Sequence, residues 1–407
     1  MPTRSYYFPS DFRHLDEIIK LEVDGLSSAD LDHFRNLNMP PLLRAGTIAI
    51  FLGISPKTIY SIRRNQSKHY RSFCMKKSDG SLRNIDTPRT YLKVVQWWIL
   101  DNILNKVVFN SNIFGFVPGR SAIQNAQYHL GAQHLLNVDI QDFFPSISIE
   151  RVRAIFSTLG FNEEVATVLS ELCCLHDRLP QGAPTSPAIA NLVLRDLDSD
   201  LSRIAEAEWY KYSRYADDLT FSSMTKIEDT FLDQVYEAVN RAGFALKPAK
   251  TRFSGRGGRM EVTGVVINEK LQPSRDWRKT TRSKLHRLRD AARLTRKEVA
   301  FLFGIKGMSV QFPDSPQMQS LAFEAENILK QKSHTVIGRG KQPVLPSGLT
   351  LRQAEVLVKL RPHKTNAELA YELGTTEAAV KKRLQEVFKK VSVTDRIEAK
   401  QWADENL

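Results

Sequence analysis

Cysteine is scarce in this chain, with three among 407 residues. Cys74 and the adjacent Cys173 and Cys174 are too few for a disulfide framework or a four-cysteine zinc site. We interpret the adjacent pair in "LSELCCLH" as small core residues of a helix, because free cysteine behaves as a small apolar side chain. A reducing cytoplasm is therefore the expected location.

Long apolar segments are also missing. No run approaches the roughly 18 residues that a membrane-spanning helix needs. The N-terminus, "MPTRSYYFPSDFRH", lacks the apolar core of a signal peptide. We therefore expect no membrane partner, although a charged membrane surface also attracts basic proteins.

Acidic residues are in deficit, since 45 Asp and Glu face 58 Lys and Arg and leave a formal net charge of +13. Such an excess favours a polyanionic partner, nucleic acid above all. The hydrophobic fraction of 42% and the charged fraction of 25% are those of an ordinary soluble protein. On a prior of roughly 150 residues per domain, the length predicts two or three domains.

Helix and strand signals divide the chain into five segments. We predict an N-terminal helical segment (1–66), a mixed α+β or α/β segment (67–268), a basic helical segment (269–333), a Gly- and Pro-rich linker (334–348) and a small helical domain (349–407). Near the end of the first segment, Ser55 is a predicted N-cap and Pro56 the first helical residue. A helix-turn-helix and a plain packing helix both stay open there.

The basic segment is unusual because residues 272–297 hold ten basic side chains and two acidic ones. Arg282, Arg289, Arg293 and Arg296 recur at helical spacing, which predicts one helix with a nucleic-acid-binding face. The alternative is a solvated helix face, but such faces usually mix both signs of charge.

Two adjacent aspartates raise the main question of the sequence. Asp217 and Asp218 stand in the middle of the strand-like run "YSRYADDLTF", although Asp is depleted in strands and like charges repel. A second acidic residue, Asp139, interrupts the apolar run in "LLNVDIQDFFPSI". If these strands are neighbours, three carboxylates converge, and Mg²⁺, which prefers oxygen ligands, would offset the repulsion. The alternative is an exposed Asp-Asp turn unrelated to Asp139.

Between these runs lies "LPQGAPTSPAIANLVL", residues 179–194. Its prolines and Gly182 predict a rigid turn, and an apolar helix should begin after Ser186-Pro187. The N-terminus of a helix suits a phosphate group or the edge of a nucleotide, but a purely structural turn would look similar.

In combination, these segments resemble reverse transcriptase. The aspartate-bearing strand, "LPQGAPTSP", "YADD" and "LKPAKTRF" follow one another as in the palm of that family, over about residues 70–310. The resemblance implies an α+β, right-hand polymerase fold with fingers and palm (67–268) and a thumb (269–333). The expected activity is an RNA-directed DNA polymerase that uses deoxynucleoside triphosphates and two Mg²⁺ ions.

The resemblance also assigns roles to individual residues. It implies that Asp139, Asp217 and Asp218 bind the metal ions and that Lys250 protonates the leaving pyrophosphate. The fingers hairpin would correspond to "MKKSDGSLRNIDTP", and Phe144 would reject a 2′-hydroxyl. The residues expected to hold the incoming nucleotide or position the template are Lys77, Arg83, Phe144, Gln181, Gly182 and Tyr215.

Two further motifs resemble those of bacterial retron reverse transcriptases. "NAQYH" fits the motif NAxxH with Asn125 and His129, and Val262, Thr263 and Gly264 fit the motif VTG. Without the family, a packed helix residue and an ordinary strand would be the simpler interpretations. With it, these residues are expected to bind a structured non-coding RNA that serves as template and primer. Priming from a guanosine 2′-hydroxyl would give a branched RNA–DNA hybrid, commonly within phage defence.

The last segment, 349–407, closely resembles the helix-turn-helix of LuxR-type transcription regulators. Capping-box patterns recur at Thr350 with Gln353, Thr365 with Glu368, and Asp395 with Glu398. The third helix, residues 377–390, would be the recognition helix, with Lys381, Lys382 and Arg383 exposed to DNA or to a partner protein. The segment departs from that family at Arg361-Pro362-His363, where a glycine-containing turn is usual.

Three functions stay open. The first is a retron reverse transcriptase with a fused helix-turn-helix domain. The second is another bacterial defence reverse transcriptase without a retron RNA, and the third is a DNA-binding regulator on an inactive polymerase. The intact Asp139, Asp217 and Asp218 argue against an inactive polymerase.

Overall fold

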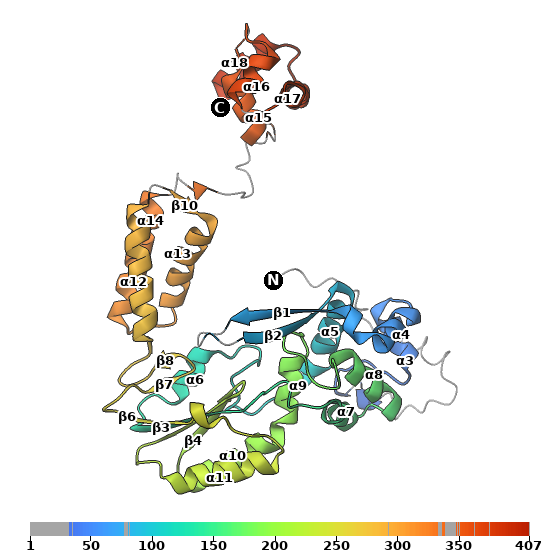
Figure 1. Ribbon diagram of the computed structural model, residues 1–407, viewed down its shortest axis with the longest axis vertical. Coiled ribbons are helices and arrows are strands. Elements are labelled where there is room, and N and C mark those ends of the chain that lie inside the picture. Colours follow the sequence, from blue (N-terminus) through green and yellow to red (C-terminus); the bar gives the residue numbers. More distant parts are fainter. Residues whose placement is uncertain are drawn as a thin grey trace. The chain divides into compact units, whose positions relative to one another are not determined.

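The computed structural model describes residues 32–34, 36–76, 80, 82–291, 293–332, 336–337, 347, 349, 351–361, 363–373 and 375–406. The chain divides into two compact units, residues 1–281 with 309–319 and residues 282–308 with 320–407. Figure 1 labels the elements along the chain. Among the described residues, no single helix is long and apolar enough to cross a membrane. One sharply bent pair, 45–52 with 56–64, meets that test by length and composition alone.

The first unit begins with helices and a hairpin. These elements are α3 (Ala45–Leu52), α4 (Pro56–Arg64), β1 (Tyr70–Lys76), β2 (Leu82–Pro88) and α5 (Thr90–Asn102). Ser55 caps α4 and Pro56 is its first residue, as the sequence predicts. Strands β1 and β2 pair antiparallel, which confirms the expected hairpin.

The centre of the unit is a four-stranded antiparallel sheet in the order β4-β5-β3-β6. Its strands are β3 (His134–Asp139), β4 (Lys211–Tyr215), β5 (Asp218–Ser223) and β6 (Arg252–Gly255). The helices around it are α6 (Ala122–Tyr128), α7 (Ile149–Thr158), α8 (Glu163–Cys173), α9 (Ser186–Val193), α10 (Arg195–Ala207) and α11 (Asp229–Arg241). Cys173 ends α8, and both it and Cys174 are fully buried, as expected for core residues.

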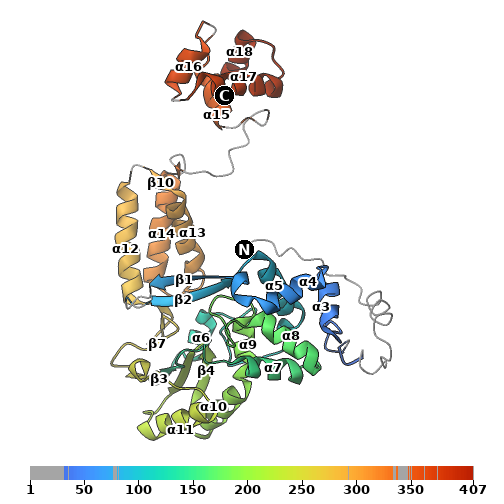
Figure 2. The same ribbon diagram turned by 45° about the vertical axis from the view of Figure 1, so that its right-hand side comes forward.

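The two faces of this sheet are covered differently, because side chains alternate along a strand. Tyr212 and Phe221 point to one face, where Phe221 packs on Phe231 of α11. Figure 2 shows α10 and α11 along one side of the sheet. Ser213 and Ser222 point to the other face, where both contact His129 at the end of α6. The sheet therefore packs against apolar side chains on one face and against polar side chains on the other.

A small three-stranded sheet follows, made of β7 (Glu261–Val262), β8 (Val265–Val266) and β9 (Gln272–Pro273). Thr263 and Gly264 form the two-residue turn between β7 and β8, with φ values of 49° and 82°. A turn of this kind needs positive φ at both positions, which explains the glycine.

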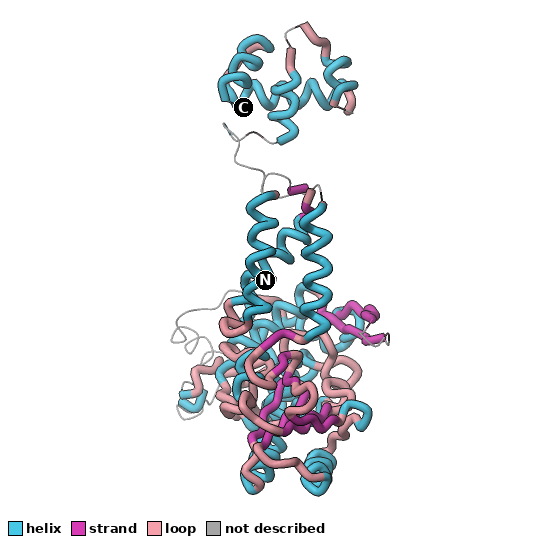
Figure 3. The backbone as a smooth tube through the Cα atoms, turned by 90° about the vertical axis from the view of Figure 1, so that its left-hand side faces the viewer, coloured by secondary structure: helices cyan, strands magenta, loops and turns pink. Residues whose placement is uncertain are grey.

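Three helices make up the basic segment, namely α12 (Arg275–Asp290), α13 (Arg296–Ser309) and α14 (Pro316–Gln331). They lie side by side (Figure 3). The single basic helix expected over 272–297 is wrong. Helix α12 ends at Asp290, and Leu294–Thr295 form the short strand β10, which pairs with β11 (Val336–Ile337). A new helix starts at Arg296 because Thr295 and Glu298 form a reciprocal capping box.

The C-terminal residues form the four helices expected from the sequence. These are α15 (Leu351–Lys359), α16 (Asn366–Glu372), α17 (Glu377–Val391) and α18 (Arg396–Asn406). Thr365 and Glu368 form the expected capping box, whereas Thr350 lies outside the described residues. Of the two bonds expected between Asp395 and Glu398, one is present. Asp395 accepts from the Glu398 amide, but Glu398 accepts from the Thr394 amide.

Candidate active site

The aspartates lie at the end of the central sheet rather than within a strand. Strand β4 stops at Tyr215, a tight turn contains Ala216 and Asp217, and β5 starts at Asp218. Ala216 adopts φ of 59°, a left-handed conformation that is uncommon for residues other than glycine. The expected position in the middle of a strand is therefore wrong, and the hairpin turn removes the conflict with strand propensity.

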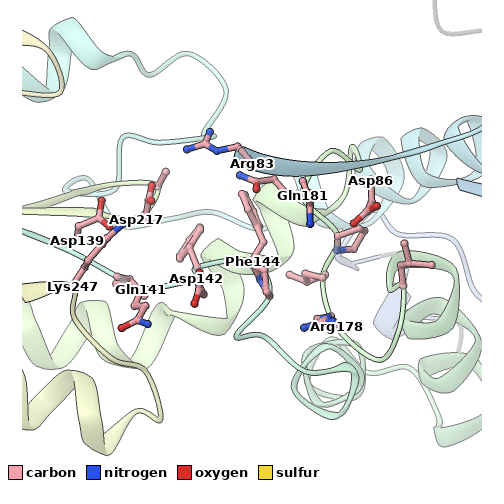
Figure 4. A pocket seen from close by; sticks show the side chains of 18 of the residues that line it. Arg83, Asp86, Asp139, Gln141, Asp142, Phe144, Arg178, Gln181, Asp217 and Lys247 are labelled. Atoms are coloured by element: carbon pink, nitrogen blue, oxygen red, sulfur yellow. The ribbon is translucent and has the colours of Figure 1, made fainter. Parts of the chain in front are cut away.

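Pairing of β3 with β5 brings the third aspartate to the same place. Asp139 is the last residue of β3 and lies opposite Asp218. The next amide, of Ile140, donates to the Asp217 carbonyl oxygen at 3.0 Å. Figure 4 shows the side chains of Asp139 and Asp217 close together on one side of the cavity. The convergence expected from the sequence is confirmed.

Electrostatics at this point are unfavourable for bare carboxylates. Loss of water, followed by the charge of Asp139, raises the pKa of Asp217 above its usual range. Loss of water, followed by the charges of Asp217 and Asp139, raises the pKa of Asp218 to about 7. Cations would relieve this repulsion.

Lys250 supplies one such positive charge. Its ammonium group bonds the Asp139 carboxylate. Burial alone would lower the pKa of Lys250, but this bond and the other carboxylates outweigh burial and raise the pKa. Lys250 therefore stays protonated beside the aspartates.

A cavity of about 520 Å³ opens beside Asp139 and Asp217. Its walls come from strand β2, the loop after β3, the loop "LPQG" and the turn before β5 (Figure 4). The lining residues include Arg83, Asp86, Phe144, Arg178, Gln181, Lys247 and Lys250. The cavity therefore joins acidic groups at one end to basic and amide groups around them.

The loop "LPQG" packs directly on the hairpin β1–β2. The Asp86 amide donates to the Gln181 carbonyl at 2.8 Å. At Gly182, where φ is 131°, an added Cβ would lie 3.0 Å from the Asp86 carbonyl oxygen, so only glycine allows this approach. Phe144 is half-buried, and its ring centroid lies 6.2 Å from that of Phe116.

Three residues proposed for the nucleotide differ from the rest. One of them, Gly182, is not among the residues that line this cavity. Lys77 lies outside the described residues. Tyr215 is half-buried directly before the turn and is not among the residues that line this cavity. Sequence reasoning missed Arg178 and Lys247, which do line it. Lys247 stands within "LKPAK", so the signal was present, whereas Arg178 had none.

A second cavity of about 470 Å³ lies on the other side of Asp139. It extends from Asp139, Asp218 and Lys250 to Thr263 and Gly264 in the β7–β8 turn. The motif VTG is therefore connected to the aspartates by a continuous groove.

The motif NAxxH is arranged otherwise than expected. Asn125 and His129 are fully buried, so direct contact of either side chain with RNA is excluded in this conformation. His129 Nδ1 and Nε2 each lie 2.7 Å from a serine Oγ, of Ser222 and Ser213 respectively. Burial, with the nearby Lys211 charge, lowers the pKa of His129 to about 3, so the ring is neutral.

The motif VTG is partly buried as well. Val262 is fully buried, which excludes RNA contact through its side chain, whereas Gly264 is exposed. The Thr263 hydroxyl donates to the Ala122 carbonyl at 3.1 Å and so ties the β7–β8 turn to α6. Both motifs therefore fasten α6 between the sheet and this turn.

The surface residues mostly meet expectation. Arg282, Arg289, Arg293 and Arg296 are exposed, although they belong to two helices and the turn between them. Lys381 and Lys382 on α17 are exposed, whereas Arg383 is half-buried instead of fully exposed.

Among the described residues, no three His, Cys, Asp or Glu side chains form a ready metal-binding group. The chemistry of the donors nevertheless fits Mg²⁺, because aspartate oxygens are the ligands that this ion prefers. The raised pKa values of Asp217 and Asp218 agree with a site that gains from a bound cation.

Comparison with known proteins gives consistent results. A family model described as "Reverse transcriptase (RNA-dependent DNA polymerase)" matches residues 75–302. The retron Ec86 reverse transcriptase of Escherichia coli is 35% identical over 259 residues, which cover 62% of this chain and 81% of that protein. The retron Mx162 reverse transcriptase of Myxococcus xanthus is 36% identical over 252 residues, which cover 54% of this chain and 52% of that protein.

A third relative is of another kind. The probable csgAB operon transcriptional regulatory protein of Salmonella typhimurium is 44% identical over 59 residues, 14% of this chain and 27% of that protein. The length of this match fits the small C-terminal helical domain.

Proposed function

We propose that this chain, which belongs to the reverse transcriptase family, copies part of a structured non-coding RNA into DNA. Members of this family are RNA-directed DNA polymerases, and this chain is of the retron type. The observation that carries the proposal is the position of Asp139 opposite Asp218 and beside Asp217, at a cavity lined by the loop "LPQG" and strand β2. A reducing cytoplasm and a role in phage defence belong to the same proposal.

Asp139, Asp217 and Asp218 would hold two Mg²⁺ ions. When bound, these ions would activate the attacking hydroxyl and stabilise the leaving oxygen. Lys250 would give a proton to the pyrophosphate, and its bond with Asp139 and raised pKa keep it in the protonated form that this role needs.

The cavity beside Asp217 would receive the deoxynucleoside triphosphate. Arg83, whose charge acts on Asp217, would bind the phosphates, and Lys77 would assist it. Gln181 and Gly182 would position the template and the nucleotide, with Tyr215 beside the turn. Phe144 would lie under the sugar and reject a 2′-hydroxyl.

The groove from Asp218 to the β7–β8 turn would hold the priming part of the RNA. Thr263 and Gly264 lie at its far end, which supports RNA contact through the turn rather than through Val262. Asn125 and His129 would act indirectly by fastening α6 beneath that turn. The exposed Arg282, Arg289, Arg293 and Arg296 would bind phosphates of the RNA and of the RNA–DNA hybrid.

The C-terminal domain would bind duplex DNA, the branched product or an effector protein through α17. Exposed Lys381 and Lys382, and half-buried Arg383, lie on this helix. The similarity to a transcriptional regulator favours DNA over protein.

The decisive experiment is expression of the full chain together with its flanking DNA. We expect a DNA of discrete length joined to RNA, shortened by RNase and released by a debranching enzyme. The Asp217→Asn variant should yield none. A discrete but unbranched DNA would contradict priming from a 2′-hydroxyl.

Random-sequence DNA made without any RNA would indicate a template-independent defence polymerase. Absence of DNA, combined with specific duplex binding, would favour the regulator on an inactive polymerase.

A further inference from the structure

Arg214 stands three residues before Asp217 on β4, and its side chain is completely buried. Removing an arginine side chain from water costs folding free energy unless its N–H donors form hydrogen bonds or ion pairs. Nε donates to Asp198 Oδ1 at 2.8 Å and Nη2 to Asp198 Oδ2 at 2.6 Å, a bidentate pair with α10. Asp198 is also nearly inaccessible, so the pair is a fully internal one.

The remaining hydrogen bonds of the guanidinium are made outside the ion pair, to α9 and to the turn that contains Ala216 and Asp217. Nη1 donates to Asn191 Oδ1 of α9 at 2.8 Å and to the Ala216 carbonyl at 3.2 Å. Ala216 is the strained residue directly before Asp217. One planar group thus connects α10, α9 and the turn that carries the aspartates.

Asn191 extends this connection to the outer side of β4. Its Nδ2 donates to the Gly115 carbonyl at 2.9 Å. Gly115 lies so close to the turn that an added Cβ would be 2.3 Å from the Ala216 nitrogen. The turn is therefore held between Gly115 and Arg214, and Asn191 contacts both.

We propose that Arg214 is a positioning residue for polymerisation, because it fixes the Ala216 carbonyl and thereby the orientation of Asp217. Through Asn191, it also couples the turn to α9, the helix that follows the loop "LPQG". The inference rests on the proposed role of Asp217. A buried ion pair adds little net stability compared with apolar residues, so geometry is the better explanation for its presence.

Arg214→Lys keeps the positive charge but cannot make the planar, forked set of bonds. We expect DNA synthesis by the full chain to slow by about a hundredfold, the scale of a small misplacement of a reacting group. The KM for the nucleotide and the affinity for RNA should change little. The affinity for Mn²⁺, measured by electron paramagnetic resonance without substrate, should fall.

Tyr212→Phe is the matched control. The Tyr212 hydroxyl donates to the same Asp198 oxygen at 2.7 Å and also lies beside Arg214, but its recorded side-chain bonds do not include the turn. This variant should lower thermal stability while keeping the rate and Mn²⁺ affinity of the parent. If Arg214→Lys likewise lowers thermal stability but leaves the rate and the Mn²⁺ affinity unchanged, Arg214 only forms an ion pair in the core and the proposal is wrong.

Asn191→Ala covers the case in which Arg214→Lys does not fold. It leaves the Arg214–Asp198 pair intact and removes the link between Arg214 and Gly115. A slower rate with unchanged nucleotide KM supports the proposal, and a parental rate overturns it. Failure of the proposed role of Asp217 can be distinguished from failure of this inference. If the role of Asp217 is wrong, Asp217→Asn would leave DNA synthesis unchanged.

Discussion

The region around the central sheet, which we propose to be the palm, buries charged and polar side chains, whereas the described part of the C-terminal domain keeps its charged side chains out of the core and buries one polar side chain, that of Gln353. In the palm, Arg214 is 0% exposed and His129 lies between two serines inside the fold. In the C-terminal domain, the pair Lys364–Glu372 is 28% and 42% exposed. Apart from Gln353, the described core of that domain is apolar, from Leu349 and Val356 to Ala403.

This difference separates two ways in which a sequence specifies a structure. An apolar core needs the right periodicity and volume and tolerates exchange among similar residues. A buried polar network needs particular partners, since each unpaired group is costly. Substitutions in the palm network should therefore change chemistry, and surface substitutions in the C-terminal domain should not.

The largest effect is expected for Asp217→Asn. Loss of one proposed metal ligand should remove several kcal/mol of transition-state stabilisation and so slow DNA synthesis by about a thousandfold or more. The basic surface is unchanged, so RNA binding in a gel-shift assay should persist. Appreciable primer extension by the variant would refute the metal assignment.

A smaller loss, of selectivity rather than rate, is expected for Phe144→Ala. Removal of the ring should let ribonucleotides compete with deoxyribonucleotides. The preference for deoxyribonucleotides should fall by about tenfold to a hundredfold, the usual contribution of one steric contact to selectivity. Matched ribo- and deoxyribonucleotide incorporation measures the change. An unchanged preference would mean that Phe144 is a packing residue only.

His129 should make the palm sensitive to acid. Its folded pKa is about 3, so below the ordinary value of about 6.5 the unfolded chain takes up a proton that the folded chain refuses. Stability is therefore lost as pH falls, by about 2 kcal/mol at pH 5 relative to neutral pH. Thermal unfolding at pH 5 and 7 measures it.

His129→Gln should unfold at lower temperature at pH 7 but lose less on acidification. His134→Gln, on β3 with a half-buried ring, is the matched histidine control. Equal acid sensitivity of His129→Gln and the parent would show that another group is responsible.

Exposed charge on α12, α13 and the turn between them, the proposed thumb, should act by binding phosphates. Replacing Arg282, Arg289, Arg293 and Arg296 with Gln should weaken RNA binding and flatten its salt dependence. The log–log slope should change by about 0.7 to 0.9 per lost contact. Lys381→Gln with Lys382→Gln, in the C-terminal domain, should leave this slope unaltered. If the arginine variant keeps the log–log slope of the parent, those side chains do not contact phosphates and lie in solvent.

The smallest effect on synthesis is expected from truncation. A chain that ends at residue 346 should copy RNA at the parental rate, because the residues assigned to catalysis end at Lys250 and C-terminal helices α15–α18 have their own core. A large loss would contradict the separation of the two regions.

The isolated C-terminal domain tests the other half of the comparison. It should bind duplex DNA or the branched product, and Lys382→Glu should weaken that binding. No binding of either at moderate salt would leave protein contact as the explanation of this domain.

Several features of the fold were predictable because local signals agree with the tertiary structure. The cap at Ser55, the hairpin β1–β2 and the capping box of Thr365 with Glu368 depend on residues close in sequence. Pairing of the strands that carry Asp139 and Asp218 was also foreseeable. Each is an apolar run with an aspartate in or beside it, and a shared site accounts for both.

Other expectations failed because burial is not a local property. Asn125, His129 and Val262 looked like RNA contacts, but packing of α6 against β4, β5 and β7 encloses them. The basic run 272–297 looked like one helix until the capping box at Thr295 divided it. Residue types predicted these segments, and the environment of each residue decided its role.

By itself, the sequence determined the types of the elements, their order and the chemistry of the three aspartates, since these depend on periodicity, caps and residue type. Tertiary structure alone decided that the aspartates stand at a hairpin turn and that His129 is neutral. It also decided that Arg214 reaches that turn from inside the palm. Partners such as Asp198, Asn191 and Gly115 are brought together by sheet pairing and helix packing, over distances that no local pattern encodes.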